Sequence, residues 1–277
     1  MMKKIKTMLI VGSGGLRGAY SGGVLAELCR KLGPDYFDTI IGSSVGAYNA
    51  TYYVANEPYA IEKIWRNYVD SDKFVDFKNI YEKGKILDLD YLTSVLKNRE
   101  VKLNTERVLK SRVNLKYVLT DCKTGKAKHF TPEKNNIFDL MKASAAMTPL
   151  YPPVKIRGRL YTDGGLAEPL PFRPEYTLKY DKIIVIHNDY KVKQKTVLFF
   201  KIFSILESKK LATIIKEYFN NLEKVKKEAI RYKNVFLLQP SKKIPLKSVI
   251  DTNKERLNAT VDLGIQDAIK VINFLKS

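Results

Sequence analysis

Residues 37–46 have the sequence Phe37-Asp-Thr-Ile-Ile-Gly-Ser-Ser-Val-Gly46. An apolar run that ends in glycine and serine, followed by a helical segment from Val45 to Asn56, predicts a buried strand that turns sharply into a helix. The chain begins in the same way, because the short apolar run Thr7–Val11 precedes a glycine-rich loop and a helical pattern over Ala19–Leu32. Successive strand–turn–helix units favour a sheet of parallel strands.

The rest of the chain continues this alternation. Hairpins are predicted over 114–130 and 154–161, and strands over 182–187 and 234–238. Helices are predicted over 59–69, 89–97, 137–147 and 252–275, with one long helix or two over 196–232. We therefore expect an α/β fold with three layers, α/β/α, around a mostly parallel central sheet. We expect one domain over residues 1–277.

The composition is that of a globular protein with an excess of positive charge. The chain has 277 residues, with 49 Lys+Arg and 29 Asp+Glu, and so a net charge of +20. No apolar run approaches the roughly 20 residues of a membrane-spanning helix, and we interpret Met1–Val11 as a first strand rather than a secretory signal. Cys29 and Cys122 are too few for a disulfide framework or a metal quartet, which favours the cytoplasm.

The positive charge indicates an anionic partner, either nucleic acid or anionic lipid, or else a solvated, lysine-rich surface with no such partner. No zinc-finger spacing, RNA-recognition motif or basic zipper is present, so nucleic acid is not expected. Residues 197–206, Val-Leu-Phe-Phe-Lys-Ile-Phe-Ser-Ile-Leu, form the most apolar stretch and are flanked by lysines. This stretch fits an interfacial helix or lid that makes peripheral contact with an anionic membrane, or else a buried core helix.

Gly42-Ser-Ser-Val-Gly46 fits the pattern Gly-x-Ser-x-Gly, with Ser44 at its centre. A strand before it and a helix after it are the context of a nucleophile elbow. The residues two before and two after the serine must be small in such a turn, and the helix N-terminus favours developing negative charge. A plain glycine-rich loop is the alternative interpretation.

The loop Gly12-Ser-Gly-Gly-Leu-Arg-Gly18 follows the first predicted strand. Its spacing fails the dinucleotide pattern Gly-x-Gly-x-x-Gly, and no Walker lysine follows. Glycine-rich loops can point backbone amides at an anion, and the arginine suits an oxyanion or an anionic headgroup. A nucleotide-binding protein that uses this loop is a third class of function to be tested.

Asp163-Gly-Gly165 is either a β-turn or the site of a catalytic base. The chain has two histidines, and His129 lies in a predicted hairpin, where a structural role is expected. His187 ends a predicted strand, so that Ser44, Asp163 and His187 follow the chain order of an α/β-hydrolase triad. A dyad of Ser44 and Asp163, in which the carboxylate takes the proton directly, is the other choice.

Together these motifs resemble the patatin-like phospholipases. The resemblance also includes Lys142-Ala-Ser-Ala-Ala-Met-Thr-Pro149, an Ala/Ser-rich helix that leads into a proline, and it covers residues from about 8 to about 170. The C-terminal, mainly helical part, from about 190 to 277, carries no matching motif. One departure is Ser13, which replaces the first glycine of the family's glycine run.

The resemblance implies a serine lipid acyl hydrolase of phospholipase A or lysophospholipase type that needs no metal or cofactor. Ser44 would be the nucleophile and Asp163 its base. The oxyanion hole would be formed by Gly14, Gly15 and Leu16, with help from Arg17. The supporting motif glycines are Gly42, Gly46, Gly164 and Gly165. The alternatives are an esterase or thioesterase for smaller acyl substrates, and a lipid-binding protein without catalysis.

Overall fold

In the computed structural model, the described residues are 5–70, 73–76, 85–98, 100–148, 150–189 and 209–277. Within them, eight strands form one sheet in the order β5-β6-β3-β2-β1-β7-β8, with β4 paired to β3. Strands β8, β7, β1, β2 and β3 are mutually parallel, and β4, β5 and β6 are antiparallel to their partners. The strands are β1 (Thr7–Val11), β2 (Thr39–Ser43), β3 (Asn114–Asp121), β4 (Ala127–Phe130), β5 (Val154–Ile156), β6 (Arg159–Asp163), β7 (Lys182–Ile186) and β8 (Val235–Leu238).

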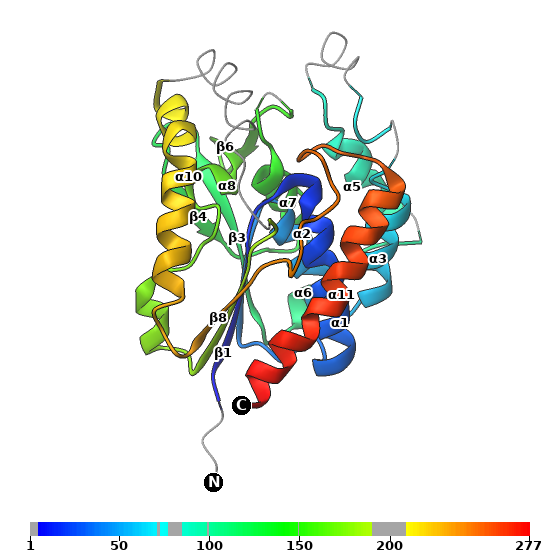
Figure 1. The fold of residues 1–277 in the computed structure, drawn as a ribbon. Helices are drawn as coiled ribbons and strands as arrows, with labels where there is room; N and C mark the ends of the chain where they lie inside the picture. The colour runs from blue at the N-terminus through cyan, green and yellow to red at the C-terminus, as the bar shows by residue number, and fades with distance from the viewer. Residues whose placement is uncertain (1–4, 71–72, 77–84, 99, 149, 190–208) are drawn as a thin grey trace.

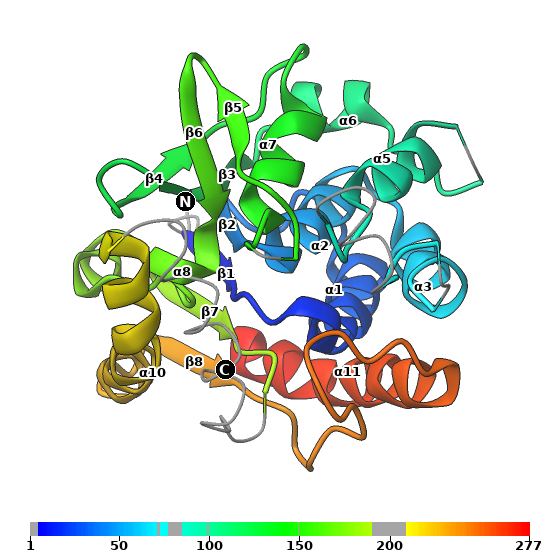
Figure 2. The ribbon, with the colours of Figure 1, turned by 90° about the horizontal axis from the view of Figure 1, so that it is seen from above.

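Helices cover both faces of the sheet, which confirms the three-layer α/β/α fold. Figures 1 and 2 show α10 on one face, and α1, α2, α3 and α11 on the other. The helices are α1 (Ala19–Leu32), α2 (Val45–Val54), α3 (Pro58–Asn67), α5 (Leu89–Asn98), α6 (Thr105–Lys110), α7 (Ile137–Ala145), α8 (Gly164–Ala167), α10 (Lys209–Ala229) and α11 (Lys254–Lys276), with 3-10 turns η1 (Gly15–Gly18) and η2 (Pro174–Leu178).

The central strands β1, β2 and β7 are mostly apolar because both of their faces are buried. Side chains alternate between the faces of a strand, and so β1 contributes to two cores. Leu9 and Val11 pack with the helices α1, α2 and α11 in the larger core. Met8 and Ile10 pack in the smaller core, which includes Leu222 of α10. This explains why the central strands are continuous apolar runs instead of alternating polar and apolar residues.

The predicted elements agree with the structure except at a few boundaries. The second strand is Thr39–Ser43 rather than 37–41, because Gly42 and Ser43 still pair with the neighbouring strands. The short helices α6 and α8 were not predicted. Over 196–232, the helix α10 occupies Lys209–Ala229, whereas the stretch 197–206 lies outside the described residues. No helix in the described ranges is long and apolar enough to cross a bilayer.

Candidate active site

Ser44 lies in the turn between β2 and α2. Its backbone has φ 56° and ψ −127°, a left-handed conformation that is costly for a residue with a side chain. The turn is tight because a Cβ on Gly46 would lie 2.3 Å from the carbonyl oxygen of Val11, and a Cβ on Gly42 would lie 2.6 Å from Cα of Ala47. A strained turn flanked by glycines is the backbone geometry that the predicted nucleophile elbow requires.

Asp163 ends β6 and caps the short helix α8. One carboxylate oxygen, Oδ2, accepts a hydrogen bond of 2.6 Å from Ser44 Oγ, and the other, Oδ1, accepts one of 2.6 Å from the amide of Gly165. The side chain is buried, and burial raises the pKa of Asp163 to about 7 even though these two hydrogen bonds lower it. A carboxylate with such a pKa can accept a proton near neutral pH.

The glycines that follow Asp163 allow two close approaches. A Cβ on Gly164 would lie 2.0 Å from the carbonyl oxygen of Val118. A Cβ on Gly165 would lie 2.5 Å from Cβ of Ser13, so the Asp163 turn and the glycine-rich loop pack directly against one another. Ser13 replaces a glycine of the family pattern, and its side chain fits here because Gly165, which lies opposite, has no side chain. The Ser13 hydroxyl makes two long hydrogen bonds to described residues, at 3.3 Å to the carbonyl of Pro169 and at 3.4 Å to Tyr218.

The glycine-rich loop leaves two amides available for an anion. Among the described residues, no hydrogen-bond acceptor is paired with the amide of Gly14 or Gly15. Gly15 has φ 56°, and a Cβ there would lie 2.5 Å from the carbonyl oxygen of Val249, so a larger residue would displace the loop. The amide of Leu16 donates to that same carbonyl at 2.8 Å, and its predicted role as an oxyanion donor stays a prediction.

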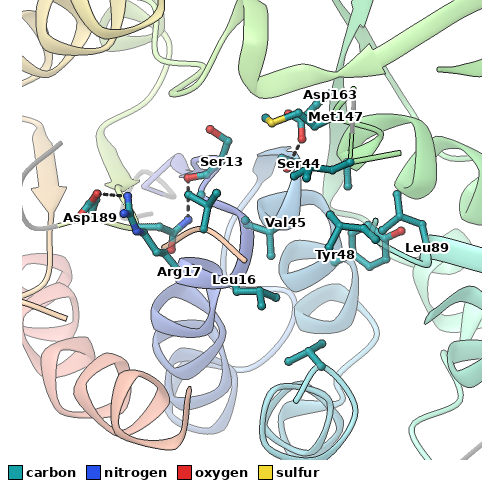
Figure 3. Close-up of a pocket in the computed structure, with 18 of the residues that line it drawn as sticks. Ser13, Leu16, Arg17, Ser44, Val45, Tyr48, Leu89, Met147, Asp163 and Asp189 are labelled. Atoms are coloured by element: carbon teal, nitrogen blue, oxygen red, sulfur yellow. Dashed lines mark hydrogen bonds and ion pairs between the residues drawn. The ribbon is translucent and has the colours of Figure 1, made fainter. Parts of the chain in front are cut away.

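Arg17 pairs with a carboxylate from a distant part of the chain. Its guanidinium forms an ion pair with Asp189, and both side chains are nearly buried. Figure 3 shows this pair on the side of the pocket away from Asp163. A direct role of Arg17 at the oxyanion therefore stays a prediction, and the contact present in the structure is with Asp189.

Neither His187 nor His129 bonds to Ser44 or Asp163 in the part of the chain that the structure describes, although His187 lines the same cavity. Burial, together with the charge of Lys226, lowers the pKa of His187 to about 3, so its imidazole is neutral at pH 7. Nε2 of His129 bonds to Glu168 at 2.6 Å.

Ser44 and Asp163 line a cavity of about 170 Å³. The cavity has an apolar arm from α2, α3, α5 and α7, and a polar arm at the ends of β1 and β7. In Figure 3, Tyr48 and Leu89 of the apolar arm lie on the opposite side of Ser44 from Arg17 and Asp189 of the polar arm. The apolar arm includes Tyr48, Trp65, Val69, Leu89, Leu92, Met147 and Leu150, and the polar arm includes Ser13, Arg17, His187, Asn188, Asp189 and Tyr218.

Several functional contacts were missed by the sequence analysis. Asn188 donates to the carbonyls of Gly12 at 2.8 Å and Ser13 at 3.2 Å, and accepts from the amide of Ser21, so it fixes the glycine-rich loop. The sequence did carry a signal for Asn188, because it directly follows a predicted parallel strand. Binding sites in α/β sheets form at the carboxyl ends of such strands. Val249 and Asp189 had no such signal. The described residues contain no cluster of three metal-ligating side chains.

Comparison with known proteins agrees with this geometry. The model of the patatin-like phospholipase family matches residues 9–176, which include the glycine-rich loop, Ser44 and Asp163. The chain belongs to the patatin-like phospholipase family. A similar protein, the uncharacterized protein YjjU of Escherichia coli K12, is 29% identical over 169 residues, which are 60% of this chain and 47% of that protein.

The chain thus spans about half the length of that curated relative. Among solved structures, VipD from Legionella pneumophila is similar, with a TM-score of 0.48 and 12% identity. The superposition covers 97% of this patatin-like chain and 67% of VipD.

Proposed function

We propose that this protein is a serine lipid acyl hydrolase, of phospholipase A or lysophospholipase type, that uses Ser44 and Asp163 as a catalytic dyad. The observation that carries the proposal is the hydrogen bond of 2.6 Å from Ser44 Oγ to Asp163 Oδ2, formed at a strained turn beside a largely apolar cavity. Membership of the patatin-like phospholipase family supports ester-bond hydrolysis as the reaction.

The first half-reaction forms an acyl-enzyme. Asp163 takes the proton of Ser44 as Oγ attacks the carbonyl carbon of the ester. The amides of Gly14 and Gly15 stabilise the negative charge that develops on the carbonyl oxygen. The intermediate then collapses, the C–O bond to the alcohol breaks, and the leaving alcohol takes the proton from Asp163. The apolar arm would hold the acyl chain.

The second half-reaction restores the enzyme. Asp163, ionised again, takes a proton from a water molecule that attacks the acyl group on Ser44. Collapse of the second intermediate releases the fatty acid and returns the proton to Ser44 Oγ. Each step uses only the dyad and the two amides.

The test is release of fatty acid by wild type, Ser44→Ala and a matched control. The control is Ser43→Ala, which removes the neighbouring buried hydroxyl, whose bond is to the carbonyl of Glu168 rather than to Asp163. We expect release from phospholipid or lysophospholipid to disappear in Ser44→Ala and to persist in Ser43→Ala. Release that persists in Ser44→Ala would contradict the proposal.

Assays with other substrates and ligands distinguish the alternative functions. Activity confined to short nitrophenyl esters or thioesters would favour the esterase or thioesterase alternative. Vesicle binding without any hydrolysis would favour a lipid-binding protein. Thermal stabilisation by a nucleotide, without hydrolysis of any ester, would favour the nucleotide-binding alternative.

Peripheral contact with an anionic membrane is a separate part of the proposal, and the net charge of +20 supports it. Binding to vesicles that contain anionic lipid should exceed binding to zwitterionic vesicles. The difference should shrink as salt rises, because the Debye length falls to about 3 Å at 1 M salt. Equal binding to the two kinds of vesicle would contradict this part alone.

A further inference from the structure

The C-terminal turn of α7 contacts both Ser44 and Asp163. The hydroxyl of Ser144 accepts a hydrogen bond of 3.0 Å from the backbone amide of Ser44. Two residues later, the carbonyl of Ala146 accepts one of 3.0 Å from the amide of Asp163. This turn lies within the Ala/Ser-rich segment 142–149, for which the proposed reaction assigns no role. Ser144 and Ala146, two positions apart, therefore hold the backbones of the proposed nucleophile and base.

The Ser144 hydroxyl is itself fixed in place. It donates to the carbonyl oxygen of Val118, in β3, at 2.7 Å. Because an amide can only donate, the hydroxyl must accept from Ser44 and donate to Val118, and its single proton is thereby committed. Ser144 is fully buried, with 0% of its surface exposed, so water cannot replace it.

Ser44 needs this partner because of its backbone conformation. Its φ of 56° is unfavourable for a residue with a side chain and persists only where the surroundings impose it. The amide of a nucleophile can also serve an oxyanion hole, but here the amide of Ser44 points to Ser144. The hydrogen bond therefore fixes the elbow without contributing to the oxyanion hole.

We propose that Ser144 is a positioning residue for acyl transfer, which holds the backbone of Ser44 so that its Oγ points at Asp163. The inference rests on the proposed function, because it assigns the residue to the same reaction. Ser144 contacts neither the ester nor the transferred proton, and it acts only through Ser44.

Removal of the hydroxyl should have two separable effects. In Ser144→Ala, the amide of Ser44 and the carbonyl of Val118 lose their shared partner, and the elbow relaxes. Ser44 Oγ then moves away from Asp163, which reduces its activation. Asp163 also loses a hydrogen bond that lowers its pKa, so the midpoint of the acid limb of the pH–rate profile should rise.

The experiment measures the rate at which a fluorophosphonate labels Ser44 and the pH dependence of nitrophenyl butyrate hydrolysis. We expect Ser144→Ala to label about 10–100-fold more slowly per folded molecule than wild type, as for other small misplacements of a reacting group. The midpoint should move above about 7. The matched control is Thr260→Val, which removes a buried hydroxyl that bonds to the carbonyl of Arg256 in α11.

Thr260→Val should label at the wild-type rate, and Ser144→Thr should restore most of the rate because it keeps the hydroxyl. If Ser144→Ala does not fold, Ser144→Cys, whose thiol is a weaker partner, should show an intermediate rate and a smaller pH shift. A wild-type labelling rate and a wild-type midpoint in folded Ser144→Ala or Ser144→Cys would overturn the inference alone. Wild type that neither labels nor hydrolyses would overturn the proposed function as well.

Discussion

Ser44 Oγ lies 2.6 Å from Oδ2 of Asp163, although the two residues are 119 positions apart in the chain. Strand β3 brings them together, because it is the common neighbour of β2 and β6. Ser43 pairs with Val118 in the parallel ladder, and Asp163 pairs with Leu119 in the antiparallel ladder. One residue past the end of β2, Ser44 therefore reaches the level of Asp163.

The raised pKa of Asp163 should appear in the pH dependence of activity. Only the ionised carboxylate can accept a proton, and its pKa is raised to about 7, so kcat/KM should fall as pH falls through about 7. A pH–rate profile on a soluble ester checks this. A midpoint near 4, the value of an unperturbed carboxyl, would contradict it.

The same carboxyl should lower the stability of the fold at high pH. Its pKa is about 7 in the folded state and about 3.9 in the unfolded state, so the folded state binds the proton more tightly. The free energy of unfolding therefore loses up to about 4 kcal/mol as pH rises from about 4 to 8. Asp163→Asn should remove this loss and be more stable than wild type at pH 8, as denaturant unfolding would show.

Asp267 is a control for that measurement, because its carboxyl should have the opposite effect on the stability of the fold at high pH. It is also buried, but hydrogen bonds to Lys270, Ser241 and Tyr20 lower its pKa despite the burial. A carboxyl with a lowered pKa stabilises the fold above its unfolded pKa, and that contribution disappears as pH falls. Asp267→Asn should therefore be less stable than wild type at pH 8.

Substitution of His187 distinguishes a dyad from a triad. His187 is buried and neutral and does not bond to Ser44 or Asp163 in the described part of the structure. We expect His187→Gln to keep kcat/KM within about threefold of wild type, whereas Asp163→Asn should lower it about 10²–10⁴-fold, the usual contribution of a general base. Equal losses in the two variants would restore the triad.

Much of the fold could be predicted from the sequence because its signals are local. The central strands are apolar runs bounded by glycine or polar residues, and helices such as Ala19–Leu32 begin and end at recognisable residues. Helix α6 was missed because its six residues are too short for a periodic pattern. The order of the strands also has no local signal, since it depends on pairing between distant segments.

The candidate site could also be predicted where its sequence signals are local. Ser44 and Asp163 were singled out because each lies in a short motif whose spacing has a chemical reason. The ion pair of Arg17 with Asp189 spans 172 positions, and the contact of Leu16 with Val249 is similarly remote. Such contacts exist only once the sheet has assembled, and so the hydrogen bond of the Leu16 amide to Val249 could not be predicted from the sequence.

The ion pair between Arg17 and Asp189 should stabilise the polar arm. Their side chains are 11% and 13% exposed, so either charge left alone would be poorly hydrated. Arg17→Met and Asp189→Asn should each lower the free energy of unfolding by about 1–3 kcal/mol. The double variant should lose less free energy of unfolding than the two single variants lose together. A double-mutant cycle, with unfolding in urea, measures the difference. Strict additivity would show that the pair contributes nothing.

Filling the apolar arm should shorten the preferred acyl chain. Leu92 lines this arm from α5, and Leu92→Trp would place a larger ring in a cavity of about 170 Å³. We expect kcat/KM for nitrophenyl dodecanoate to fall about tenfold or more while that for the butyrate stays within about threefold, because a short chain leaves the arm unfilled. The control is Ser94→Trp, which adds a ring at an exposed position of the same helix. A parallel loss on both esters in Leu92→Trp would mean that the acyl chain binds elsewhere.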